Sequence, residues 1–218
     1  MGKPKFTGEL SSLWELQTLA PIHHLTWDWW WWLVMLDGDE RNPAGRQLMV
    51  LWSTKDNSFV EVNGIPWEPS GRPGFDEKGS IAMDGMVAAW YYDGNELVEP
   101  LVLEKSRIIV LAENHPEWPF KKGGIIASHT EQEYSMGLNA EEDEFWVKLD
   151  TDYGEFDLKM LPWNPAMSSL KVAQSEYGLG MGYGISRLHG SICKGKVRGE
   201  SVTGTAYFQK VCVQAPSP

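Results

Sequence analysis

The sequence lacks several features that define large classes of proteins. Of its 218 residues only two are cysteine, and no apolar run approaches the ~18 residues that a membrane helix requires. Cys193 and Cys212 do not have a metal-ligand spacing, and we expect both to be reduced thiols. Acidic residues (30) outnumber basic ones (19), and the net charge of −11 disfavours nucleic acid and anionic membranes as partners. Small molecules or other proteins are the expected partners.

The start of the chain, "MGKPKFTGEL", contains lysines without a hydrophobic stretch after them. We therefore expect no secretory leader and a cytoplasmic location. The length and an apolar fraction of 42% suit one domain with a large core. We place that domain at residues 4–213 and expect residues 214–218 to be a disordered tail. A second copy of the chain, forming a homodimer, is one candidate partner.

Familiar catalytic and cofactor-binding motifs are also missing. "GLGMGYG" has the wrong spacing for a phosphate loop or a dinucleotide fingerprint, and no serine stands in a nucleophile elbow. The adjacent His23 and His24 cannot both point to one face of a strand, and no set of cysteines or glutamates completes a metal site beside them. The sequence thus predicts no metal and no cofactor, and any catalysis would depend on acid–base groups in a shaped apolar cavity.

One segment has the period of a helix. In "GELSSLWELQTLA", residues 8–20, the side chains of Leu10, Leu13 and Trp14 share one face, and Pro21 follows. Most of the chain after this proline has the shorter period of strands.

The strand signals recur to the end of the chain. Residues 26–36 and 46–54 flank a charged turn segment and predict a hairpin, and residues 80–92 end in the turn signal "DGN". A second hairpin folds at Asp150 to Gly154, and residues 177–213 contain short strands punctuated by glycine. Eight to ten strands without βαβ alternation predict an all-β fold, an antiparallel sheet that curls or closes into a barrel.

The stretch "TWDWWWWLVM" divides into two faces because successive strand residues point to opposite sides. Both faces are apolar apart from one aspartate, so both must be covered. We expect a barrel interior to cover one face and the N-terminal helix the other. The first face carries Asp28, Trp30, Trp32 and Val34, and the second carries Trp27, Trp29, Trp31, Leu33 and Met35.

Two further strands carry single polar residues on apolar faces. Asp84 shares its side with Trp90, and Gln47 shares its side with Met49 and Leu51. An apolar pocket with a few placed polar groups has this composition. The alternatives are that the tryptophans form ordinary core, that Asp28 caps a loop at the end of its strand, and that Asp84 faces solvent.

Two regions, about a third of the chain, resemble the N-terminal lipocalin-like domain of the carotenoid 1,2-hydratase and AttH family. "DWWWWLVML" followed by "GRQLMVLW" is similar to the family's glutamate-Trp-Trp-Tyr-Phe stretch and its glutamine strand, with Asp28 at the glutamate and Gln47 at the glutamine. "GYGISRLHGSICKGKVRGESVTGTAY" is similar to a later family segment, with matches at Tyr183 and Arg187 and with Tyr207 in place of a tryptophan.

The resemblance implies a lipocalin-like (calycin) barrel and a hydrophobic small-molecule substrate or ligand, since members hydrate or cyclise isoprenoid and polyketide chains. The sequence departs from the family at three points. "FQKV" replaces an Asp-His-Glu segment, Gly184 replaces a serine, and 218 residues leave no room for the second domain of a typical member.

Three functions compete on these observations. The first is an enzyme that hydrates, isomerises or cyclises an apolar unsaturated molecule. A carboxyl group in an apolar pocket has a raised pKa and can donate a proton, and indole faces stabilise the resulting cation. The second is a non-catalytic binder of a lipid, isoprenoid or pigment, and the third is a carbohydrate-binding module. The candidate catalytic residues are Asp28, Asp84 and Tyr183, and the candidate substrate-binding residues are Trp30, Trp32, Gln47, Trp90 and Arg187.

Overall fold

A computed structural model of the chain contains strands and turns, and no helix, in the part that it describes. The described residues are 25–37, 40, 45–56, 60–62, 65–67, 74–75, 77, 81–111, 124–128, 133–139, 144–162, 167–174 and 182–215. Their strands are β1 (Leu25–Leu36), β2 (Arg46–Asp56), β3 (Val60–Val62), β4 (Ile65–Trp67), β5 (Gly74–Phe75), β6 (Ile81–Tyr92), β7 (Leu97–Leu111), β8 (Gly124–Ser128), β9 (Glu133–Asn139), β10 (Glu144–Thr151), β11 (Gly154–Pro162), β12 (Met167–Gln174), β13 (Gly182–Val197) and β14 (Glu200–Ala215). Within these ranges no helix has the length and apolar character needed to span a membrane.

Twelve strands form one antiparallel sheet in the order β11-β10-β9-β8-β7-β6-β2-β1-β14-β13-β12, with β5 paired to β6. Strands β3 and β4 form a separate two-stranded sheet. Strand β11 also pairs with β13, through Phe156–Pro162 and Ser191–Val197. This additional pairing connects β11, at one end of the strand order, to β13, the strand next to the other end.

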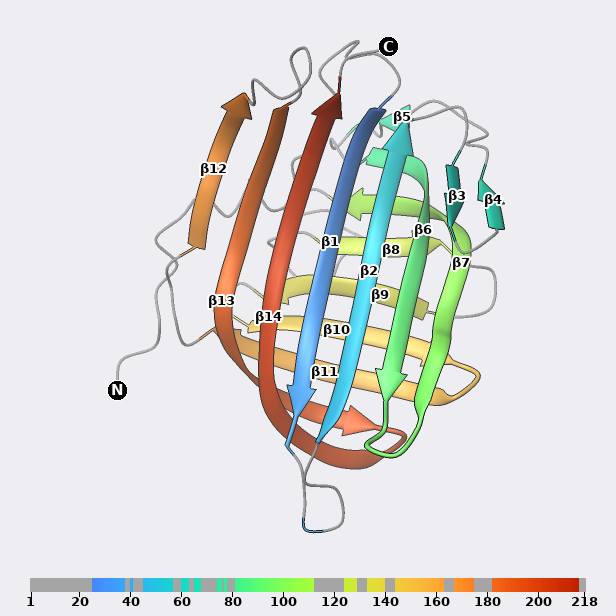
Figure 1. Cartoon of the computed structure of the whole chain (residues 1–218), viewed down its shortest axis with the longest axis vertical. Helices are drawn as coiled ribbons and strands as arrows, with labels where there is room; N and C mark the ends of the chain where they lie inside the picture. Colours follow the sequence, from blue (N-terminus) through green and yellow to red (C-terminus); the bar gives the residue numbers. More distant parts are fainter. Residues whose placement is uncertain are drawn as a thin grey trace.

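The main sheet is strongly curled into a half-barrel (Figure 1). Strands β13, β14, β1, β2, β6 and β7 run lengthwise in one layer, and β8 to β11 cross behind them (Figure 1). The lower ends of β13 and β14 curve under the molecule toward β11, where the β11–β13 pairing is made. Such crossing of two layers produces a concave side that must be filled by side chains.

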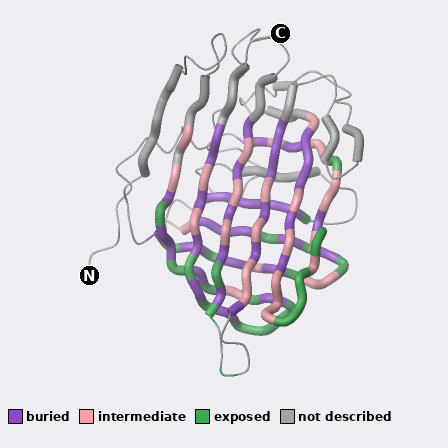
Figure 2. Tube along the Cα trace, viewed as in Figure 1, coloured by how far each residue is buried: buried purple, intermediate pink, exposed green. Residues whose placement is uncertain are grey.

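The core lies between the two layers. Buried and partly exposed residues alternate along the lengthwise strands, and the turns at the lower end are exposed (Figure 2). The buried cluster draws on both layers, with Trp30, Trp52 and Val87 from one and Phe145 and Phe156 from the other. Each of these side chains is fully buried, which is worth about 1.5–3 kcal/mol for a large apolar side chain.

The expected all-β, antiparallel organisation is confirmed, and so are the hairpins of β1 with β2 and of β10 with β11. The main sheet has twelve strands instead of eight to ten, because it includes short strands such as β5 and β8 that the sequence pattern does not indicate. The predicted helix at residues 8–20 lies outside the described residues. Cys193 is free, and burial, with a smaller effect of Asp37, raises the pKa of its thiol to about 12.

The end of the chain corrects one expectation. Instead of short strands punctuated by glycine, it forms β13 and β14, two strands of 16 residues each. Gly195 and Gly204 stand within these strands because a side chain would collide with a neighbouring backbone. A Cβ atom at Gly195 would overlap the carbonyl oxygen of Asp157, and one at Gly204 would overlap that of Met35. These glycines therefore permit close approach between strands and do not end them.

We expect Gly195→Ala to lower the free energy of unfolding by about 1–3 kcal/mol, because the added methyl group forces β11 and β13 apart. Urea denaturation monitored by tryptophan fluorescence measures the change. The matched control is Lys194→Ala, a substitution at the exposed neighbouring residue. If the two variants differed by less than about 0.5 kcal/mol, the close approach at Gly195 would not be a real constraint.

Candidate functional site

Strand β1 places one charged side chain inside the half-barrel. Asp28, Trp30 and Trp32 project to the concave side and are buried, whereas Trp29 and Trp31 on the other face are only half-buried. The predicted division of this stretch into two faces is therefore confirmed for the described side chains. Asp28 does not stand exposed at the rim, since its side chain is only 2% exposed.

Lys210 of β14 is the basic partner of Asp28. The antiparallel register sets Lys210 beside Trp30, one diagonal step from Asp28. Its Nζ lies 3.8 Å from Asp28 Oδ1 and 5.7 Å from the centroid of the Trp30 ring, and its side chain is 6% exposed. The site thus contains a buried carboxylate–ammonium pair against an indole.

Sequence reasoning missed Lys210, although a signal for it exists. Ala206, Phe208 and Lys210 alternate along β14, so the lysine occupies the next position of an apolar face. Strand periodicity assigns it to the interior, but only the register of β14 with β1 shows that it meets Asp28.

A second polar connection joins the two layers. The indole Nε1 of Trp52 donates to the backbone oxygen of Tyr134 at 3.2 Å, and the hydroxyl of Tyr134 donates to Glu104 Oε1 at 3.0 Å. Burial, and then the adjacent Glu104 carboxylate, raise the pKa of the Tyr134 hydroxyl, which stays protonated. Thr54, which is buried directly opposite Asp28, adds a hydroxyl to this part of the interior.

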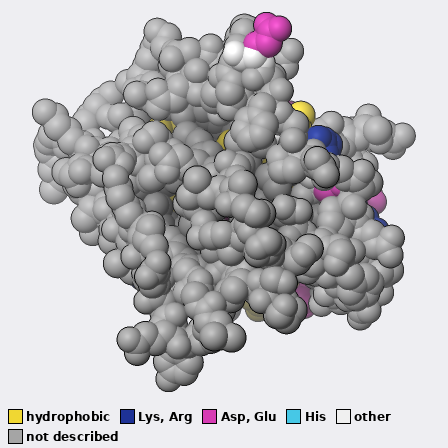
Figure 3. Space-filling model, turned by 90° about the horizontal axis from the view of Figure 1, so that it is seen from above, with side chains coloured by type: hydrophobic (Ala, Val, Ile, Leu, Met, Phe, Trp, Pro, Cys, Tyr) yellow, Lys and Arg dark blue, Asp and Glu magenta, His cyan; other side chains and the backbone are white. Residues whose placement is uncertain are grey.

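Beyond this polar layer the interior is filled by aromatic rings. The Trp32 ring centroid lies 4.7 Å from that of Phe208 and 5.5 Å from that of Phe145, and the two phenylalanine rings are 5.8 Å apart. These are ordinary distances for packed aromatic side chains. Trp32 therefore belongs to the core, and the polar groups around Asp28 lie between this core and the end at which β1 begins. Described apolar side chains are visible in the view onto that end (Figure 3).

The sheet separates four of the predicted site residues from Asp28. Gln47 and Trp90 are half-buried on the convex side, because their strand neighbours Leu48 and Ala89 point inward. Arg187 occupies the same side, since the next residue, Leu188, is buried in the core.

Asp84 is also on the convex side, where Arg107 of β7 donates to Asp84 Oδ1 at 2.9 Å. Tyr183 pairs with Val213 in the backbone, but its side chain lies outside the described part of the structure. Of the predicted set, the structure brings together Asp28, Trp30 and Trp32. A single interior cavity cannot include Asp84, Gln47, Trp90 and Arg187, because the parity of each strand directs them away from it.

The chemistry available at Asp28 follows from its partner. A nearby ammonium group favours the ionised form of a carboxyl group, whereas burial favours the neutral form, and both influences act on Asp28. The ammonium group of Lys210 is a hydrogen-bond donor, and the carboxyl group of Asp28 supplies acceptor oxygens. Among the described residues, no three His, Cys, Asp or Glu side chains are arranged to hold a metal ion.

The sequence matches no family model and no curated protein. The chain is similar to the crystal structure of a candidate AttH protein from Nitrosomonas europaea, with a TM-score of 0.43 and 11% identity over 100% of this chain and 59% of that one. It is also similar to an S-type phycobiliprotein lyase from Guillardia theta, with a TM-score of 0.29 and 13% identity over 97% of this chain and 96% of that one. The chain therefore spans about 59% of the length of the AttH structure. At these values neither similarity indicates an activity or a ligand for this chain.

The buried pair gives a test by double-mutant cycle. We expect Lys210→Met to lower the free energy of unfolding by about 3–5 kcal/mol, because it leaves the Asp28 carboxylate buried without its cation. Adding Asp28→Asn to that variant should restore a large part of the loss, since the amide carries no charge. Chemical denaturation of the wild type, both single variants and the double variant measures the coupling. Additive effects would show that the two side chains do not interact.

Proposed function

We propose that the chain binds an apolar small molecule whose polar group contacts Asp28 and Lys210 inside the half-barrel. The observation that carries this proposal is a carboxylate–ammonium pair buried against the Trp30 indole, on the concave side of a curled antiparallel sheet. Binding sites for small molecules combine mainly apolar walls with a few placed polar groups. The interior around Asp28 has that composition.

The separation of the charged atoms supports a role in binding. At 3.8 Å, Lys210 Nζ and Asp28 Oδ1 are in an ion pair but are too far apart for a good direct hydrogen bond. In the proposed complex, a hydroxyl, carbonyl or carboxylate oxygen of the ligand accepts a hydrogen bond from the Lys210 ammonium group. Trp30 and Trp52, both fully buried, supply apolar surface beside this polar point.

Acid-initiated hydration, isomerisation or cyclisation is the second candidate, and the burial of Asp28 among tryptophans favours it. Two features weigh against it. Lys210 favours the ionised carboxyl, whereas proton donation needs the neutral one. The ammonium also lies near the Trp30 ring, in the place where a substrate cation would be stabilised. Binding without catalysis requires neither a neutral Asp28 nor a free indole face.

The binding proposal is tested by titration with a fluorescent polyene fatty acid, whose emission rises in apolar surroundings. We expect saturable binding that Trp30→Phe weakens by roughly fivefold, since one large ring surface beside the polar point is reduced. Trp31→Phe is the matched control: Trp31 is the next residue but faces the convex side, where its Nε1 donates to Gln209. Binding that is absent, or is weakened equally by both substitutions, would contradict an interior site.

Catalysis has a separate test. Native mass spectrometry of protein from its own host identifies a bound apolar molecule, which is then incubated with the wild type and with Asp28→Asn. If Asp28 is the proton donor, conversion of that molecule should fall by about 100-fold or more in the variant, the usual contribution of a general acid. For a binder we expect no conversion by either protein and retention of the molecule by both. Conversion unchanged by the substitution would exclude Asp28 as the acid.

A further inference from the structure

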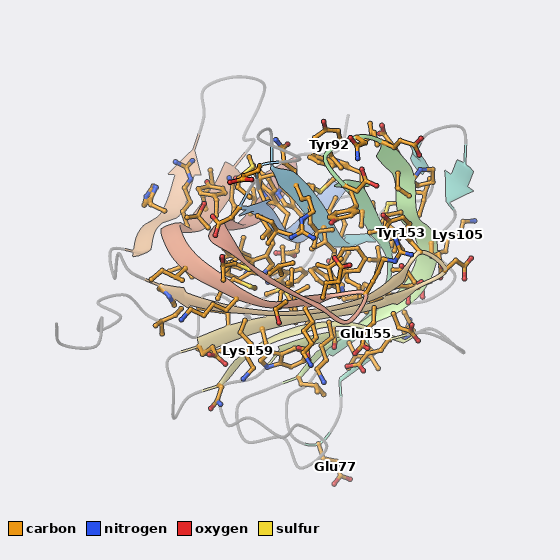
Figure 4. The ribbon with its side chains drawn as sticks, turned by 90° about the horizontal axis from the view of Figure 1, so that it is seen from below. Glu77, Tyr92, Lys105, Tyr153, Glu155 and Lys159 are labelled. Atoms are coloured by element: carbon orange, nitrogen blue, oxygen red, sulfur yellow. The ribbon has the colours of Figure 1, made fainter. Side chains whose placement is uncertain are left out.

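A pocket of about 300 Å³ opens at the lower end of the half-barrel, where three hairpins turn. The turns follow β6, β10 and β13, and the start of β2 completes the wall. Seen from below, Tyr153 lies on the inner side of β11, and Glu155 and Lys159 lie on its outer side (Figure 4). The lining residues are Arg46, Tyr91, Asp93, Tyr153, Val197, Arg198 and Glu200.

The backbone holds Arg198 in position at the mouth of this pocket. Arg198 has a φ of 53°, a left-handed conformation that costs about 1–2 kcal/mol for a residue with a side chain. Its backbone N–H donates to Glu155 O at 2.7 Å, and its side chain lies over Gly154, where a Cβ would come within 2.6 Å of Arg198 Cγ. The guanidinium carbon is 4.6 Å from the centroid of the Tyr153 ring. An exposed arginine is thus pre-oriented over an aromatic face.

Arg46, at the start of β2, supplies a second guanidinium group to the lining. Its side chain is 24% exposed and lies near the Tyr91 hydroxyl, whose pKa is raised chiefly because it is buried. Its acidic neighbour is Glu200, at 3.9 Å between Nη1 and Oε2. An ion pair at this distance with a carboxylate that is 81% exposed contributes little. Most of the five N–H donors of a guanidinium group therefore have no strong acidic partner here.

The acidic residues of the lining are poorly placed to bind a cation. Asp93 Oδ1 accepts the backbone N–H groups of Asn95 and Glu96, both at 2.8 Å, and Oδ2 accepts the hydroxyl of Tyr153 at 3.4 Å. Those backbone hydrogen bonds lower the pKa of Asp93, which is ionised and engaged in its own turn. Glu200 extends into solvent. The strongest donors in the lining are the guanidinium groups of Arg46 and Arg198.

We propose that this pocket binds a small organic anion, a carboxylate or a phosphate ester, between the guanidinium groups of Arg46 and Arg198. Guanidinium groups bind both kinds of oxyanion through paired N–H donors. The ring of Tyr153 and the hydroxyl of Tyr91 complete the site with a stacking surface and a neutral hydrogen-bonding group. The volume is at the lower end of the range for small-molecule sites, which fits a compact ligand.

This site is distinct from the interior pair. Arg46 pairs with Leu36, eight residues along β1 from Asp28, which corresponds to about 26 Å of extended strand. The aromatic rings of Trp32, Phe145 and Phe208 lie between the two levels. The two proposals can therefore be tested separately. Absence of anion binding would not contradict the proposed function, and failure of the proposed function would not contradict the anion site.

Isothermal titration calorimetry of the full chain with benzoate, succinate and inorganic phosphate tests the proposal. We expect saturable binding of at least one probe, in the submillimolar range and weaker at high salt. A preference for benzoate assigns the site to carboxylates with a ring that stacks on Tyr153, and a preference for phosphate assigns it to phosphate esters. Absence of saturable binding of all three probes overturns the proposal.

Three variants test which side chains contribute to binding of the anion. Arg198→Gly removes one guanidinium group and relieves the left-handed backbone, so it should fold at least as well as the wild type while binding the preferred probe about tenfold more weakly. Glu200→Gln removes the competing carboxylate and should strengthen binding by roughly two- to threefold. Lys196→Gln removes one positive charge from an exposed position of the same hairpin and should leave binding unchanged.

Comparison of the three variants distinguishes binding of the anion in the pocket from non-specific electrostatic attraction to the surface. Equal weakening by Arg198→Gly and Lys196→Gln would mean that the local positive charge of the hairpin, and not the pocket, attracts the anion. Weaker binding in Glu200→Gln would mean that the carboxylate contributes to the ligand site, contrary to the proposal. Thermal unfolding of each variant confirms that the proteins compared are equally folded.

Discussion

The pairing of β1 on both sides is the constraint on which the rest of the structure depends. From Leu25 to Leu36 the strand pairs with β14, and from Thr26 to Leu36 it also pairs with β2. Because side chains alternate with a period of two, this register decides which tryptophans enter the core and which face outward. A slip of one residue would expel Asp28, Trp30 and Trp32 together and would turn the other face inward. Because the sheet is curled, the face that carries these residues becomes its concave side, where their side chains pack into the core.

The same sheet presents polar groups in two different settings. In the interior, the Asp28–Lys210 pair is nearly excluded from water, so each charge depends on the other and on polar groups nearby. At the lower end, Arg46 and Arg198 are partly hydrated and surround a pocket. The aromatic layer at Trp32 separates these settings. We propose the first setting as the contact for the polar end of an apolar molecule and the second as a site for a small anion.

The sequence predicts the local pattern well and the long-range pattern poorly. The alternation in β1 and the turn at Asp150 to Gly154 are local signals, and the structure confirms both. The sequence could not show that Lys210 meets Asp28, because that contact depends on the register of distant strands. The same limit applies to Trp90, which lies on an aromatic strand but faces away from Asp28. In the sequence alone, Gly195 and Gly204 suggest breaks between short strands. In the structure, a neighbouring backbone lies too close to each of them for a side chain to fit.

The partnership of β1 with β14 also has a consequence for how the chain folds. Trp31 and Gln209, which hydrogen-bond across these strands, are 178 positions apart in the sequence. Contacts of such long separation form slowly because a long loop must close first. Until β14 arrives, β1 is an edge strand, and a tryptophan-rich edge is prone to pair with another chain. The strand that organises the finished sheet is therefore left as an edge until β14 pairs with it, one of the last steps in assembling the sheet.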